Sequence, residues 1–169
     1  MSRDSSPRVF RSILCPVDFS PNSRAALRYA AMLARLSDAH LIVLFVDDPL
    51  LATAAASRRG AAALLASSED ELRHFVSGTL RSTTPRVSTT LLTKAGKPAR
   101  EIVNSAARHG CDVIVMGYRG IGRASRFLFG STTEEVVRKT TVPVLAIPPA
   151  RRGARLPAAA ARARLKRAS

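Results

Sequence analysis

Five short apolar runs alternate with helix-like segments along the chain, and this alternation restricts its possible folds more than any other feature. Strands that alternate with helices need crossover connections, which give a parallel sheet with helices on both faces. Four of the five runs are almost continuously apolar, as strands covered on both faces should be. The sequence therefore predicts an α/β fold with one doubly wound, Rossmann-like parallel sheet of five strands in the order 3-2-1-4-5. The predicted strands lie within 9–18, 40–46, 86–93, 112–116 and 142–147.

The segments between these strands carry helix signals. Ser20 and Pro21 suit the N-cap and the first position of a helix. The residues that follow place an apolar stripe on one helical face, which can cover the sheet. Further helices are predicted to end near Arg81, to begin near Pro98 and to cover 131–139.

A glycine-rich loop follows the fourth predicted strand, with the pattern Gly117-x2-Gly120-x9-Gly130-Ser131. Glycine lets the backbone approach a ligand closely, and the Ser and Thr residues that end the loop resemble a helix start, whose N–H groups favour phosphate. Gly117, Gly120 and Gly122 are spaced GxxGxG, which is not the GxGxxG of dinucleotide-binding proteins. The Gly-Lys pair of the chain, Gly96-Lys97, precedes a proline, so it is not the GxxxxGK[ST] of P-loop NTPases. We therefore predict a phosphate cradle, and the alternative is a glycine-rich surface turn.

A second motif is predicted to lie beside this loop. In a doubly wound sheet, ligands bind outside the carboxyl ends of the strands, where the strand order reverses. With the order 3-2-1-4-5, the first and fourth strands are neighbours at that point. Asp18 follows the first strand and Gly117 follows the fourth, so both are expected at the same site.

Length and composition fit one domain with an ordinary core, since 46% of the 169 residues are hydrophobic and 23% are charged. The sequence contains no apolar run long enough for a membrane span, and its first residues do not resemble a signal peptide, so we expect a cytoplasmic protein. The predicted domain covers 8–149. An Ala/Arg-rich tail, 150–169, supplies +7 of the net charge of +15 and is predicted to be disordered or partly helical.

The cysteines and histidines show no pattern typical of catalysis or metal binding. Cys15 and Cys111 are predicted at opposite ends of the sheet, too far apart for a disulfide, and are expected to be core thiols. His40, His74 and His109 are isolated in sequence and lack the spacing of a metal site.

These motifs together resemble the universal stress protein family over nearly the whole chain, from about residue 10 to 148. The similar segments are the first strand with its acid (13–20), the start of the third helix (96–99) and the fourth strand with its glycine (112–117). The glycine-rich loop is similar to the pattern of the ATP-binding branch of that family. The resemblance implies the fold of adenine nucleotide alpha hydrolase-like proteins, with ATP as the ligand.

The resemblance also implies a role for each part of the site. Residues of the first strand line the adenosine side, and the end of the second strand holds adenine through its backbone. The glycine-rich loop wraps the ribose and phosphates, and the start of the last helix, 130–133, completes the phosphate site through backbone N–H and hydroxyl groups. Mg²⁺ or Mn²⁺ would bind through the phosphates, because no carboxylate cluster offers a dedicated site. The implied nucleotide-binding residues are Pro16, Val17, Asp18, Val46, Met116, Gly117, Arg119, Gly120, Gly122, Arg123, Gly130, Ser131, Thr132 and Thr133.

The sequence favours an ATP-dependent regulator of the stress response over a dedicated catalyst. Fast phosphoryl transfer needs a group that positions water and a group that stabilises charge. Asp18 and the loop arginines are the candidates for these two groups, and for Asp18 we favour contact with adenosine or orientation of a metal ion. We therefore assign no catalytic residue and expect at most slow hydrolysis. The family further implies a homodimer through the last strand, 142–147, which would cover an apolar sheet edge.

Two alternative functions stay open. One is an adenylating enzyme of the same fold, although no further signature follows the first strand. The other is a protein that binds nucleic acid or another acidic partner through the basic tail and leaves the nucleotide site unused.

Overall fold

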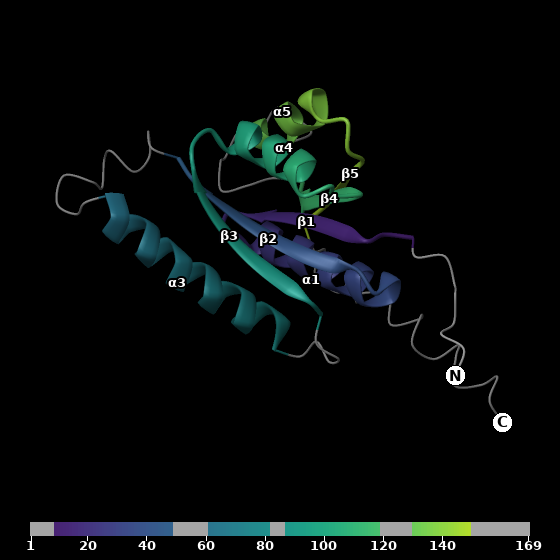
Figure 1. Ribbon diagram of the computed structural model, residues 1–169, viewed down its shortest axis with the longest axis horizontal. Helices are drawn as coiled ribbons and strands as arrows, with labels where there is room; N and C mark the ends of the chain where they lie inside the picture. Colours follow the sequence, from purple (N-terminus) through teal and green to yellow (C-terminus); the bar gives the residue numbers. More distant parts are fainter. Residues whose placement is uncertain (1–8, 49–60, 82–86, 119–129, 150–169) are drawn as a thin grey trace.

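Five parallel strands form one sheet in the order β3-β2-β1-β4-β5, as the sequence predicts (Figure 1). The computed structural model describes residues 9–48, 61–81, 87–118 and 130–149, with backbone alone for 61–66. The elements are β1 (Ser12–Val17), α1 (Pro21–Ser37), β2 (His40–Asp47), α3 (Ala61–Leu80), β3 (Thr89–Ala95), α4 (Pro98–Arg108), β4 (Val113–Gly117), α5 (Ser131–Lys139) and β5 (Val144–Ile147). No helix in these ranges is both long enough and apolar enough to cross a membrane.

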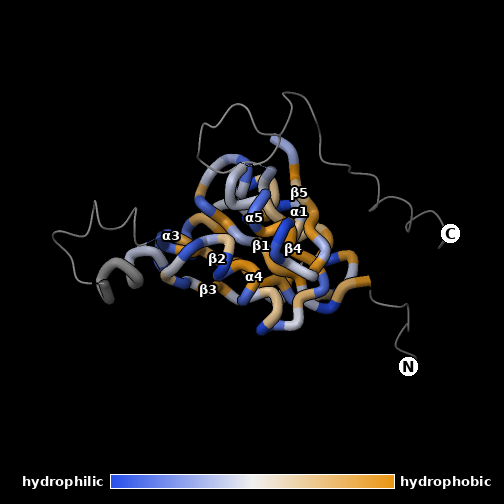
Figure 2. Tube along the Cα trace, turned by 90° about the horizontal axis from the view of Figure 1, so that it is seen from above, coloured by the Kyte–Doolittle hydropathy of each residue, from blue (hydrophilic) through white to orange (hydrophobic). Residues whose placement is uncertain are grey.

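Helices cover both faces of the sheet, with α1 and α3 on one face and α4 and α5 on the other (Figure 1). Alternate strand residues therefore enter two separate cores: Ile13 and Cys15 pack toward α1 and α3, and Leu14 packs toward α4 and α5. Hydrophobic residues gather along the strands in Figure 2. This two-sided burial explains why the central strands read as continuous apolar runs.

Local signals in the sequence set the helix boundaries. Ser20 is the N-cap of α1: its side chain accepts a hydrogen bond from the Ser23 N–H, and Pro21 takes the first helical position. At the end of α4, Gly110 has a φ of 56°, a left-handed conformation that glycine adopts without a Cβ clash. Its N–H donates to the carbonyl of Ala107, which closes the helix in the manner typical of a glycine directly after the C-cap residue.

The second and fourth strands each end one residue beyond the predicted range, and the third and fifth differ more in their bounds. The third strand is displaced from 86–93 to Thr89–Ala95, because it pairs with β2 along the whole length from Leu41 to Asp47. The last strand is shorter than 142–147, because β5 pairs with β4 only from Ile114 to Gly117. Edge strands have one neighbour, so that neighbour sets their length. The predicted tail, 150–169, lies outside the described residues.

The two cysteines are buried free thiols, as predicted. Cys15 lies in β1 and packs toward α1 and α3, whereas Cys111 precedes β4 and packs toward α4 and α5. Burial raises the pKa of both thiols. The thiolate, which is the nucleophile, is therefore disfavoured at both positions.

Candidate functional site

The strand order reverses between β1 and β4, which lie side by side in the middle of the sheet. From their carboxyl ends the chain continues to α1 on one face and toward α5 on the other (Figure 1). This divergence is the feature that creates ligand sites in doubly wound folds. It brings the end of β1, with Asp18, close to the end of β4, with Gly117, although they are far apart in sequence.

Pro16 ends the hydrogen-bond ladder between these two strands. The Ser12 carbonyl accepts from the Asp112 N–H at 2.8 Å, so the backbone groups of every second residue of β1 point toward β4. Pro16 lies in this alternation and has no N–H to donate. The β1–β4 pairing accordingly stops at Leu14 and Ile114, whereas β1 stays paired with β2 as far as Val17. The ends of β1 and β4 are therefore not held together by a continuous ladder.

The turn after β1 fixes the carboxylate of Asp18 by a compact set of hydrogen bonds. Its Oδ1 accepts from the Ser20 N–H at 3.1 Å, and its N–H donates to Ser23 Oγ at 3.3 Å. The Ser23 hydroxyl in turn donates to the carbonyl of Ser20 at 3.1 Å. The Asp18 side chain is thus held at the start of α1, on the β1 side of the switch point.

Phe19, between Asp18 and Ser20, adopts a left-handed backbone conformation with a φ of 61°. A bulky residue rarely adopts this conformation, because its Cβ approaches the carbonyl oxygen. Ring contacts offset the cost: the Phe19 ring stacks on Phe45 with centroids 4.5 Å apart and meets Phe75 edge-on at 5.3 Å. The turn that carries Asp18 is therefore fastened to the end of β2 and to α3.

Arg24 closes this aromatic cluster from the side of α1. Its guanidinium carbon lies 4.4 Å from the centroid of the Phe75 ring, and its Nη1 donates to Thr79 Oγ1 at 3.0 Å. The sequence pattern does not reveal this cluster, although Phe19 and Phe45 each adjoin a predicted site residue. Adjacency to Asp18 and Val46 was the available signal, but Phe75 is too distant in sequence to be paired with them in advance.

The end of β4 packs tightly against the start of α1. A Cβ placed on Gly117 would lie 3.1 Å from the carbonyl carbon of Asn22 and 3.2 Å from its Cβ. Contacts this short are tighter than those of most real Cβ atoms, so a side chain here would require Asn22 to move slightly and glycine suits the close approach. Gly117 therefore allows the end of β4 to pack directly against the start of α1.

The start of α5 is tied to the end of β4 by two hydrogen bonds. The Gly130 N–H donates to the carbonyl of Tyr118 at 3.0 Å, and Thr133 Oγ1 donates to the carbonyl of Gly117 at 3.1 Å. The N-cap of α5 is Gly130, which offers no side chain to the first-turn N–H groups. Ser131 is exposed and Thr132 half-buried, so this helix start can receive an anion.

The described residues of the predicted site all lie at the carboxyl edge of the sheet or at the start of α5. Val17 and Met116 are buried in the two cores and form its base, and Val46, at the end of β2, is half-buried. Thr133 was predicted to offer its hydroxyl to phosphate, but the structure shows that hydroxyl donating to Gly117. The predicted residues Arg119, Gly120, Gly122 and Arg123 lie outside the described residues.

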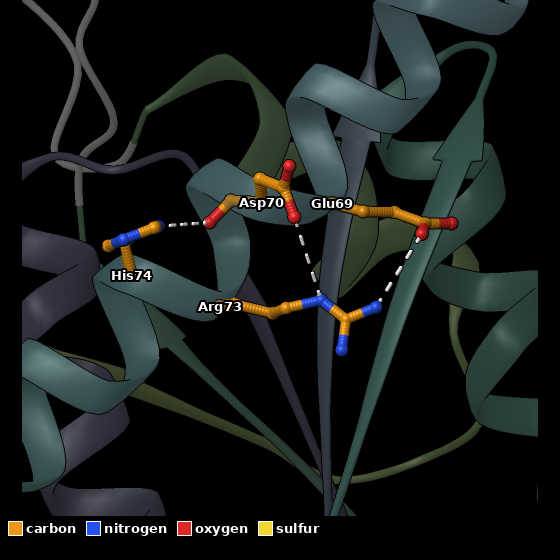
Figure 3. A network of polar contacts seen from close by, with 4 residues as sticks. All are labelled: Glu69, Asp70, Arg73 and His74. Carbon is orange, nitrogen blue, oxygen red and sulfur yellow. Dashed lines mark hydrogen bonds and ion pairs between the residues drawn. The ribbon is translucent and has the colours of Figure 1, made fainter.

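Other polar groups lie away from this edge. On α3, Arg73 is 3.9 Å from both Glu69 and Asp70, and His74 Nδ1 donates to the Asp70 carbonyl at 2.8 Å (Figure 3). These side chains belong to neighbouring turns of one exposed helix face, where ion pairs contribute little. Within the described ranges, no three potential metal ligands of the His, Cys, Asp and Glu types come together.

The contacts of His40 and His109 indicate structural roles. At the amino end of β2, the two ring nitrogens of His40 lie 2.9 Å from Ser88 Oγ and Thr90 Oγ1. His109 is the C-cap of α4, and its backbone N–H donates to the Ser105 carbonyl at 3.0 Å.

Comparison with known proteins identifies relatives over most of the chain. Residues 10–148 match the model of the universal stress protein family. The chain is 26% identical over 154 residues to universal stress protein MJ0577 of Methanocaldococcus jannaschii, covering 82% of this chain and 95% of the relative. It is 29% identical over 148 residues to universal stress protein YxiE of Bacillus subtilis, covering 82% and 99% respectively.

Solved structures share the fold. The structure of MJ0577 superposes with a TM-score of 0.70 at 26% identity, covering 83% of this chain and 97% of the other. A universal stress protein in complex with cAMP has a TM-score of 0.61 at 20% identity, covering 83% and 98%. The universal stress protein from Archaeoglobus fulgidus in complex with dAMP has a TM-score of 0.57 at 22% identity, again covering 83% and 98%.

Proposed function

This chain belongs to the universal stress protein family, and from that premise we propose that it binds an adenine nucleotide, ATP in particular, as a regulator of the stress response. The observation that carries the proposal is the meeting of three features at the switch point. They are the Asp18 carboxylate, the closely packed Gly117 and the start of α5 without a side-chain cap. Two proteins of the same fold were solved with cAMP and with dAMP, which supports an adenine nucleotide as the ligand.

The start of α5 would hold the phosphates. Its first-turn N–H groups have no acceptors within the helix, and the positive end of the helix dipole favours an anion there. Gly130 adds no side chain to this end, and the exposed Ser131 hydroxyl can donate to a phosphate oxygen. The proposed site extends to the loop residues Arg119, Gly120, Gly122 and Arg123.

The ends of β1 and β2 would hold the adenosine. Val17 and the half-buried Val46 would supply apolar surface for the base, and the backbone of Val46 would hydrogen-bond to its edge. The Asp18 carboxylate, which accepts from the Ser20 N–H at the end of β1, would face a ribose hydroxyl or a metal-bound water.

Mg²⁺ or Mn²⁺ would enter with the phosphates. The described residues show no metal-ligand cluster at this edge, and both ions readily bind through phosphate oxygens and water. We propose at most slow hydrolysis, because Asp18, whose carboxylate accepts from the Ser20 N–H, would contact the adenosine or orient the metal ion and would not activate water.

We also propose a homodimer through β5. This strand forms one edge of the sheet, and Leu145 on it is 40% exposed. Pairing with a second copy would cover that edge. Light scattering should give twice the mass of one chain, and Leu145→Glu should lower it to the mass of a monomer; an unchanged mass would place the interface elsewhere.

The charge distribution favours a second candidate function, the binding of an acidic partner. More than half of the basic residues lie outside the described ranges, whereas Asp4 is the only acidic residue there. The tail 150–169 contributes seven of these basic residues. Such a charge excess favours nucleic acid or another anionic surface.

Calorimetric titration with ATP and Mg²⁺ tests the nucleotide site. Gly130→Val places a branched side chain where a phosphate must approach, and it should abolish binding. The φ of Gly130 is −67°, which valine adopts without strain, so the variant should fold. Gly78→Val is the matched control, because a Cβ on Gly78 in α3 meets no atom within 4 Å. Equal affinity in wild type and Gly130→Val would overturn the proposed site.

A further inference from the structure

Thr133 is the residue whose observed contact departs most from the sequence expectation. It is 2% exposed, and its hydroxyl donates to the Gly117 carbonyl, across 16 residues of sequence, at 3.1 Å. Removing the donor would leave a buried carbonyl without a hydrogen bond, which costs free energy of folding. This bond therefore contributes more to stability than an exposed one. The hydroxyl of Thr133 is therefore already hydrogen-bonded inside the molecule. It is not the group that would contact a phosphate at the start of α5, where Ser131 is exposed.

The acceptor of this bond belongs to the residue that also touches α1. On one side, the missing Cβ of Gly117 allows the backbone of Asn22 to approach; on the other side, its carbonyl receives the Thr133 hydroxyl. The next residue, Tyr118, donates its N–H to Ile147 at 2.7 Å and accepts from Gly130. The starts of α1 and α5 are thus fastened to the same short stretch of chain at the end of β4.

We propose that Thr133 is a positioning residue for the phosphate side of the nucleotide site. This inference rests on the proposed function. The Thr133–Gly117 bond sets the distance between the first-turn N–H groups of α5 and the β1 side that holds the adenosine. Phosphates far from the ribose depend on this distance most, because they must reach the helix start while the base stays in place. Without the hydroxyl, the first turn of α5 can shift away from β4 and the donors no longer match those phosphates.

The geometry assigns specific effects to substitutions at this position. Thr133→Val keeps the shape of the side chain and removes the donor, so the affinity for ATP should fall about tenfold, the size of one hydrogen bond. AMP lacks the outer phosphates, so its affinity should change by less than about twofold. Thr133→Ser keeps the donor and should restore the preference for ATP over AMP.

A matched control separates positioning from general stability. Thr79, 3% exposed on α3, donates its hydroxyl to the Phe75 carbonyl at 2.6 Å, far from the start of α5 in the fold. Thr79 also accepts from Arg24 on the β1 side of the site, so Thr79→Val should lower the melting temperature. Any effect of this variant on the adenosine side should change ATP and AMP affinity alike and leave their ratio unchanged.

The experiment is calorimetric titration of wild type and these variants with Mg-ATP and with AMP, alongside thermal melting. A wild type that binds neither nucleotide refutes the proposed function itself. A wild type that binds ATP while Thr133→Val keeps the same affinity, or loses ATP and AMP affinity equally, refutes the positioning role. If Thr133→Val does not fold, Thr133→Cys replaces it. The weakly donating thiol must then give an ATP preference below that of the serine variant, and an equal preference refutes the role.

Discussion

The left-handed turn at Phe19 leads to an unusual order of stability among substitutions. In regular backbone, glycine is less stable than alanine by about 0.5–1 kcal/mol, because it loses more conformational freedom on folding. At a φ of 61° the order should reverse, since alanine keeps a Cβ that strains this conformation by about 1–2 kcal/mol and glycine does not. We therefore predict that Phe19→Gly is more stable than Phe19→Ala by about 1 kcal/mol.

Both variants should be less stable than the wild type, because both lose the ring. Phe19 is half-buried, so the loss of its side chain should cost about 2 kcal/mol, below the range for a fully buried phenylalanine. Loss of the contacts with Phe45 and Phe75 should add about 1 kcal/mol. Phe19→Ala should then be destabilised by about 3 kcal/mol and Phe19→Gly by about 2 kcal/mol.

Urea denaturation gives these differences directly as changes in the free energy of unfolding. Phe10 offers a matched control, because it is half-buried against the same core and its φ is not positive. There, alanine should be the more stable of the two replacements. If alanine also exceeds glycine in stability at position 19, the turn is not strained and the account of the aromatic cluster is wrong.

Three further predictions follow from other parts of the molecule. Thr93→Val should raise the free energy of unfolding by about 1 kcal/mol in urea denaturation, because Thr93 Oγ1 is buried without a hydrogen-bond partner in the described structure; a loss of stability would show that the hydroxyl is satisfied. Backbone N–H groups of Arg11 and Ser12 hold the pKa of Asp112 below its ordinary value, so its carboxylate stabilises the fold above about pH 4 and that contribution is lost as pH falls through the lowered pKa. Asp112→Asn should thus cost about 1 kcal/mol at pH 7, reduced by solvent screening, with the difference vanishing in melts at low pH; a constant difference would contradict this. Deleting 150–169 should remove any salt-dependent binding to duplex DNA in a fluorescence anisotropy titration, and unchanged binding would exclude the tail as the anion-binding part.

The order of the elements was predictable from the sequence, because strands buried on both faces have a distinctive hydrophobic pattern. The buried strands are continuous apolar runs, and Ser20-Pro21 marks a helix start that the structure confirms. The meeting of Asp18 with Gly117 was predictable as well, because the strand order alone makes β1 and β4 neighbours.

Contacts within the site were harder to predict, because they depend on register and on side-chain direction. The hydroxyl of Thr133 is two residues from the exposed Ser131, yet the helical turn directs it into the molecule toward Gly117. The approach of Asn22 to Gly117 joins two segments that no local pattern connects. The bounds of β3 likewise depend on its neighbour β2 and not on its own residues.

The most direct test of the central claim is to map the nucleotide onto the chain by following backbone amide NMR signals during titration with Mg-ATP. Nucleotide binding at the switch point predicts saturable shifts at the carboxyl edge of the sheet, at Asp18, Val46, Gly117 and the first turn of α5, with His40 and Ser88 at the opposite edge unchanged. Shifts confined to other parts of the chain, or no saturable shifts at all, would contradict it.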